Sequence, residues 1–148
     1  MKPRNPEFII FTGPMFGSKT TRMLAAIDRY RYQNKQVAAF KPKIDKRYSI
    51  SSISTHSGGA MPAICVETGD DIKENVHLST DVIAVDEAFM IPGASKSLVE
   101  LFQRGHTIVV SSLQLSAAGN TFDEIRDMMP WATKIEVCPA VCPICGSD

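Results

Sequence analysis

The sequence predicts an α/β fold in which a mostly parallel sheet has helices on both faces. Three observations predict this architecture. Short apolar runs alternate with amphipathic stretches along the chain, which is the pattern of strands joined by helices. A glycine-rich segment follows the first apolar run directly, and two carboxylates end a later one. Polar residues therefore stand where predicted parallel strands terminate.

The composition indicates one globular domain without a broad surface of one charge. The chain has 148 residues, of which 44% are hydrophobic, and 16 Lys and Arg balance 16 Asp and Glu. This neutrality argues against nucleic acid or an anionic membrane as a partner. No apolar stretch approaches the roughly 20 residues that span a bilayer, and no signal peptide is recognisable. We therefore expect a cytoplasmic protein.

The first half of the chain predicts three strands, one helix and a long connection. The apolar run at 7–11 predicts a buried strand, and apolar residues at helical spacing across 20–33 predict an amphipathic helix. Residues 36–41 predict a second strand. Residues 43–63 are polar and rich in Ser and Gly, which predicts a loop or a hairpin. Residues 63–66 predict a short strand.

The second half continues the alternation. Apolar runs at 82–85, 106–111 and 132–137 predict strands. Helical spacing predicts helices at 94–104 and 121–129, which end at a glycine and at a proline. The alternation of strands with helices favours a mostly parallel sheet with helices on both faces.

The segment 13–20 reads Gly-Pro-Met-Phe-Gly-Ser-Lys-Thr and lies between a predicted strand and a predicted helix. This is the context of a P-loop, whose backbone N–H groups point at phosphate oxygens. Lys19 would bridge the β- and γ-phosphates of ATP, and the Thr20 hydroxyl would bind Mg²⁺. The predicted phosphate-binding residues are Gly13, Pro14, Met15, Phe16, Gly17, Ser18, Lys19 and Thr20.

Ser18 departs from the usual P-loop pattern, which has glycine immediately before the lysine. If this position requires a positive φ, serine is strained there by roughly 1–3 kcal/mol. The alternative interpretation of the segment is a glycine-rich turn before an ordinary helix.

Asp86 and Glu87 follow the apolar run Val82-Ile83-Ala84-Val85. In a P-loop fold this strand lies beside the phosphate loop, where Asp86 would hold Mg²⁺ and Glu87 would accept a proton from an attacking hydroxyl. The alternative is a surface acidic turn after a core strand. The functional interpretation requires Asp86 and Lys19 to converge on one point.

Four segments together resemble the thymidine kinases of the cellular and bacterial type. They occur in the family's order and at similar spacing, and they cover nearly all of the chain. The segments are Gly13-Pro14-Met15-Phe16 with Lys19-Thr20-Thr21, Asp45-Lys46-Arg47-Tyr48 with Thr55-His56, Asp86-Glu87-Ala88, and Cys142-Pro143-Ile144-Cys145.

This resemblance implies a RecA-like P-loop fold and transfer of the ATP γ-phosphate to the 5′-hydroxyl of a deoxynucleoside, thymidine or a related pyrimidine. It implies that Glu87 is the base for that hydroxyl and that Asp86 and Thr20 serve Mg²⁺. Thr21, Asp45 and Arg47 would then belong to the ATP site. Members of the family are commonly tetramers, so the resemblance also implies a homo-oligomer.

The nucleoside half of the site departs from the family pattern. Phe89 and Met90 stand where the family has Gln and Phe after the acidic pair, and Gln114 replaces an aspartate. A pocket aromatic of the family falls near Ala117, whereas Phe122 keeps a later one. The resemblance places the nucleoside pocket at Met90, Leu113, Ala117 and Phe122.

Cys142 and Cys145 have the C-x-x-C spacing of half a zinc ribbon, and a closed structural zinc site needs four ligands. Cys138 is a candidate third ligand, with Cys65, His106 or another chain as the fourth. The alternatives are partners outside this sequence, or reduced thiols. We expect residues 1–137 to form the kinase domain and 138–148 to begin a zinc segment that lacks the family's closing loop and second ligand pair.

Two other functions are compatible with these motifs. The first is a P-loop ATPase in which Glu87 activates water, and the second is a nucleotide-binding remnant without catalysis. ATP turnover with and without deoxynucleosides distinguishes all three.

Overall fold

The computed structural model describes residues 5–13, 19–43, 52–54, 60–113 and 123–138. Its centre is a six-stranded sheet in which all neighbouring strands are parallel. In order across the sheet, the strands are β5 (Ile64–Val66), β2 (Val37–Pro42), β6 (Val82–Asp86), β7 (Thr107–Leu113), β1 (Phe8–Gly13) and β8 (Lys134–Val137). The predicted parallel α/β fold is confirmed.

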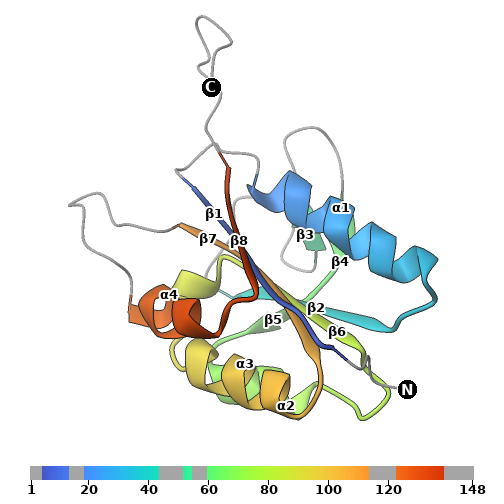
Figure 1. Cartoon of the computed structure of the whole chain (residues 1–148). Coiled ribbons are helices and arrows are strands. Elements are labelled where there is room, and N and C mark those ends of the chain that lie inside the picture. The colour runs from blue at the N-terminus through green and yellow to red at the C-terminus, as the bar shows by residue number, and fades with distance from the viewer. Residues whose placement is uncertain (1–4, 14–18, 44–51, 55–59, 114–122, 139–148) are drawn as a thin grey trace, which may run out of the picture.

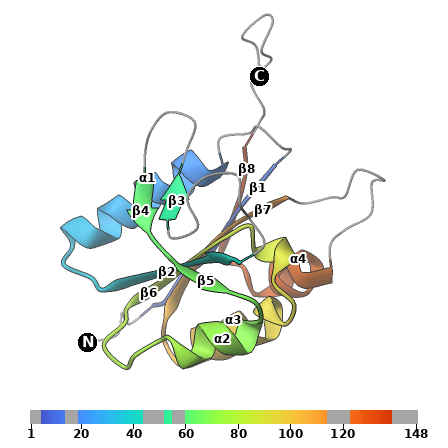
Figure 2. The ribbon, with the colours of Figure 1, turned by 180° about the vertical axis from the view of Figure 1, so that it is seen from behind.

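Helices lie on both faces of the sheet, as predicted (Figures 1 and 2). One face carries α1 (Lys19–Tyr32), and the other carries α2 (Gly69–Glu74), α3 (Ala94–Gln103) and α4 (Asp123–Met128). Alternate residues of β1 serve the two faces: Phe8 and Ile10 join the core under α3 and α4, whereas Ile9 and Phe11 join the core under α1. This period of two is what a strand buried on both faces requires.

The structure changes several predicted boundaries and adds elements. The predicted connection 43–63 contains an antiparallel hairpin of β3 (Ser52–Ser54) and β4 (Ala60–Pro62). The helix predicted at 121–129 is α4, followed by the 3₁₀ turn η2 (Met129–Trp131), because Pro130 cannot continue an α-helix. Helix α2 and the 3₁₀ turn η1 (Ala88–Met90) were not predicted. No helix in the described ranges is both long and apolar enough to cross a membrane.

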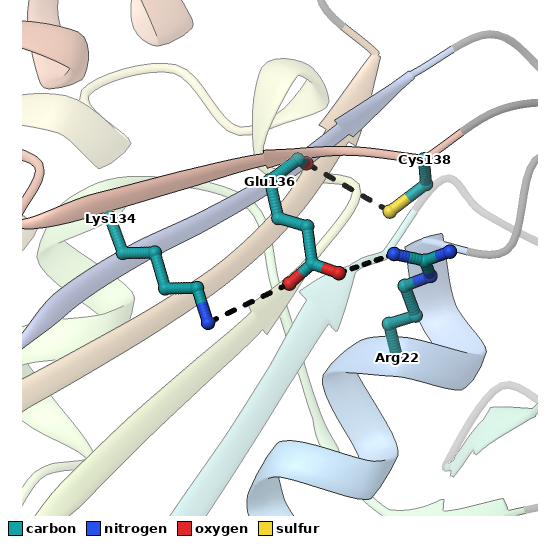
Figure 3. A network of polar contacts seen from close by, with 4 residues as sticks. All are labelled: Arg22, Lys134, Glu136 and Cys138. Atoms are coloured by element: carbon teal, nitrogen blue, oxygen red, sulfur yellow. Dashed lines mark hydrogen bonds and ion pairs between the residues drawn. The ribbon is translucent and has the colours of Figure 1, made fainter.

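Helix α1 is tied to the edge strand β8 by charged side chains (Figure 3). Arg22 of α1 forms an ion pair with Glu136, and Lys134 lies 3.9 Å from the same carboxylate. These side chains are partly exposed, so their contribution to stability is modest. They join the first turn of α1, which also contains Lys19 and Thr20, to β8.

Gly13, the last residue of β1, lies against the residue that follows β8. Cys138 donates its N–H to the Thr12 carbonyl over 2.7 Å, and a Cβ on Gly13 would lie 2.1 Å from the Cys138 carbonyl oxygen. Gly13 also has a φ of +152°, which disfavours other residues. A side chain is therefore excluded here by both space and backbone conformation.

We expect Gly13→Ala to lower the free energy of unfolding by about 2–5 kcal/mol, because backbone strain and a backbone clash act together. Urea denaturation measures this change. Gly93→Ala is the matched control, since Gly93 also has positive φ but its added Cβ would meet nothing closer than 3.7 Å. Equal losses in the two variants would contradict the role of the Cys138 contact.

Candidate functional site

Asp86 and Thr20, the predicted Mg²⁺ ligands, meet at the carboxyl end of the sheet, although their strands are not neighbours. β7 lies between β6, which ends at Asp86, and β1, which ends at Gly13. The prediction placed the acidic strand beside the phosphate loop, and the end of this strand contacts Thr20, the second residue of α1.

Asp86 and Thr20 are in contact, although 66 residues separate them in sequence. The Thr20 hydroxyl donates to Oδ1 of Asp86 over 3.1 Å. Lys19, the residue before Thr20, begins α1 and is only 5% exposed. A lysine buried to this degree is stable only with polar or anionic partners, which is the condition that a phosphate site provides. The structure thus places Asp86 in contact with Thr20, next to Lys19 in the sequence.

Glu87 begins the turn η1, which lies on the face of the sheet opposite α1. Its backbone is left-handed, with φ 54° and ψ 44°, and its carbonyl accepts the N–H of Met90 over 3.0 Å. Non-glycine residues rarely adopt this conformation, and such strain gathers at functional sites. The residue is also 6% exposed. This conformation turns the chain away from the direction of β6 immediately after Asp86.

Two serines that were not predicted contact Asp86 and the turn after Glu87. Ser111 donates its hydroxyl to Oδ1 of Asp86 over 2.7 Å, and Ser112 accepts the N–H of Phe89 over 3.2 Å. Both serines are completely buried at the end of β7. Two polar residues at the end of an apolar run are visible in the sequence, but their partners depend on β7 lying next to β6.

Glu124 is a third residue that was not predicted. The N-terminus of α3 has no side-chain cap of its own, since its N-cap is Gly93. The Glu124 carboxylate of α4 accepts the N–H groups of Gly93 over 3.0 Å and of Ser95 over 2.8 Å. A carboxylate at this position is favoured by the helix dipole. It fixes α4 against the segment that follows η1.

The predicted nucleoside pocket is described only in part. Met90 is half-buried at the end of η1, and Leu113 ends β7. Thr21 is exposed in the first turn of α1. The other predicted site residues lie outside the described residues; they are Pro14, Met15, Phe16, Gly17, Ser18, Asp45, Arg47, Ala117 and Phe122, together with His56.

The cysteines limit the zinc interpretations. Cys138 is buried beside α1, after the edge strand β8, and Cys65 is in β5 at the other edge, five strand spacings or roughly 24 Å away. His106 precedes the amino end of β7 and contacts the Thr80 carbonyl, roughly 20 Å along the strands from Cys138. Completion of a Cys138 site by Cys65 or His106 is therefore wrong.

No cluster of three or more His, Cys, Asp or Glu that could hold a metal occurs in the described part of the chain. Cys142 and Cys145 lie outside it, and the zinc site with these ligands stays a prediction.

The donor set at Asp86 and Thr20 fits Mg²⁺, which prefers a small number of carboxylate and hydroxyl oxygens together with substrate phosphates. Both oxygens are side-chain atoms that already approach each other to 3.1 Å. A site with two protein ligands needs no cluster of carboxylates, since phosphate and water oxygens supply the rest.

Comparison with known proteins agrees with this geometry. A family model described as thymidine kinase matches residues 7–148. A thymidine kinase from Thermococcus kodakarensis is 33% identical over 154 aligned positions, which cover 99% of this chain and 78% of that protein. The match includes the strand ends, the phosphate-binding segment and the acidic pair. The chain therefore belongs to the thymidine kinase family and is a nucleoside kinase.

Proposed function

We propose that the chain transfers the γ-phosphate of ATP, with Mg²⁺, to the 5′-hydroxyl of a deoxynucleoside, thymidine or a related pyrimidine. The observation that carries this proposal is the 3.1 Å contact between Thr20 and Asp86 beside the buried Lys19. This arrangement has the ligands for Mg²⁺ and the cation for the β- and γ-phosphates at one place.

The residues have separate roles in this proposal. Lys19 binds phosphate oxygens, and Thr20 and Asp86 would hold Mg²⁺, which would supply charge neutralisation at the phosphate oxygens. Glu87, the residue after Asp86, accepts the proton of the 5′-hydroxyl as that oxygen attacks the γ-phosphorus and ADP leaves.

The turn at Glu87 supports its role as the base. Its carbonyl accepts the N–H of Met90, and Ser112 accepts the N–H of Phe89, so both ends of the turn are held. A base held in this way needs little rearrangement before it takes a proton, which is how positioned groups accelerate transfer.

The test is ATP turnover with and without thymidine, deoxyuridine, deoxycytidine and a purine deoxynucleoside, with 5′-deoxythymidine as the acceptor control. We expect thymidine or another pyrimidine to stimulate ADP release and to yield a 5′-monophosphate. 5′-Deoxythymidine should do neither, because it has no acceptor hydroxyl. Turnover that no nucleoside changes would favour the ATPase alternative, and ATP binding without turnover would favour the remnant.

Residues 138–148 as the start of a zinc segment and the homotetramer are proposals that rest on the family resemblance.

A further inference from the structure

Ser111 and Ser112 are adjacent in β7, and their contacts lie on opposite faces of the sheet. Ser111 pairs in register with Asp86 and donates to it, whereas Ser112 accepts from Phe89 in η1. This split follows from the strand period of two, which sends neighbouring side chains to opposite faces. One strand end therefore contacts Asp86 through one hydroxyl and the turn that follows Glu87 through the other.

Oδ1 of Asp86 accepts two hydroxyl hydrogen bonds, from Thr20 at 3.1 Å and from Ser111 at 2.7 Å. The two donors differ in their proposed roles. Thr20 is itself a proposed ligand of Mg²⁺, so its oxygen changes partners when the ion binds. Ser111 is completely buried in the central strand and has no proposed ligand. Its hydrogen bond can therefore hold the Asp86 carboxylate in the same orientation with and without the ion.

We propose that Ser111 is a positioning residue that orients the Asp86 carboxylate for Mg²⁺. The proposal rests on the proposed function, because it takes Thr20 and Asp86 as the ligands of the ion. The sheet register supports this role. Ser111 of β7 is paired with Asp86 of β6, so the two side chains lie on the same face of the sheet and within hydrogen-bond distance.

A residue that orients a metal ligand changes metal affinity by about 10–100-fold when it is removed. We expect Ser111→Ala to leave ATP affinity in EDTA unchanged and to raise the Mg²⁺ concentration at half-saturation by about this factor. Ser111→Cys keeps the size of the side chain but donates weakly, so its value should lie between those of the parent and Ser111→Ala. Titration calorimetry of ATP binding at several Mg²⁺ concentrations gives these values without relying on turnover.

Ser112→Ala is the matched comparison, because it removes the neighbouring buried hydroxyl on the other face. Its Mg²⁺ half-saturation should equal that of the parent, although its phosphoryl transfer should slow as the turn at Glu87 loosens. Thermal unfolding shows which variants are folded. If Ser111→Ala does not fold, the Mg²⁺ half-saturation of Ser111→Cys tests the role of the hydroxyl.

Three outcomes would overturn the inference. Unchanged Mg²⁺ half-saturation in a folded Ser111→Ala shows that the hydroxyl does not orient Asp86. If Ser111→Ala loses ATP affinity equally in EDTA and in Mg²⁺, the substitution has loosened the whole nucleotide site and has not acted on the Mg²⁺ ligand alone. If Ser112→Ala raises the Mg²⁺ half-saturation as much as Ser111→Ala does, the effect is not specific to the hydroxyl that contacts Asp86. If the parent binds ATP equally with and without Mg²⁺, the proposed function itself fails at Asp86, which is a distinguishable result.

Discussion

Glu87→Gln should retain ATP binding and lose phosphoryl transfer by about 10²–10⁴-fold, the usual contribution of a positioned general base. The amide keeps the size of the side chain but cannot take the proton of the acceptor hydroxyl. Because Glu87 is buried and its φ is positive, the backbone of the turn should tolerate this nearly isosteric change better than a truncation. Single-turnover transfer to the best nucleoside measures the effect.

The exposed Glu74 of α2 offers the control. Glu74→Gln removes the same charge away from the site and should transfer at the parent rate. Undiminished transfer by Glu87→Gln, with the nucleotide still bound, would show that another group takes the proton.

Lys19→Ala should weaken ATP binding by about 100-fold, since a buried ammonium makes charge-assisted hydrogen bonds to phosphate oxygens. The side chain is 5% exposed at the first position of α1, so little water could replace it. Calorimetry in Mg²⁺ measures the affinity, and circular dichroism establishes that α1 is retained.

Lys96→Ala is the matched control, because Lys96 is exposed on α3, which lies on the other face of the sheet. It should bind ATP as tightly as the parent. If Lys19→Ala binds ATP as tightly as the parent, the phosphate-loop interpretation is contradicted. The proposed roles of Thr20 and Asp86 would then lose their support.

Most strands were predictable because their signal is local. The runs that became β1, β2, β6 and β7 are apolar over several residues, and burial on both faces requires such runs. The helix α2 had a readable signal that was overlooked. Thr68 and Asp71 form a capping box, in which the Thr68 hydroxyl accepts the Asp71 N–H and the Asp71 carboxylate accepts the Thr68 N–H.

The parts of the site that a sequence motif defines were predictable. The parts that depend on the order of the strands were not. Thr20 and Asp86 were expected to meet, and they do. Ser111 and Glu124 were not expected, because their partners lie 25 and 29–31 residues away and are fixed by how β7 and α4 pack. Sequence spacing carries no information about such a contact until the order of the strands is known.

The position of β1 has a consequence for how the kinase is made. In the sheet this first strand pairs with β7 and β8, both from the last third of the chain. Glu7 meets Thr107 across 100 residues, and Phe8 meets Thr133 across 125. Such non-local pairing raises contact order and slows folding. During synthesis the N-terminal strand emerges from the ribosome long before either of its partners exists. The proposed nucleotide site at the end of β1 can therefore form only after β7 and β8 have been synthesised.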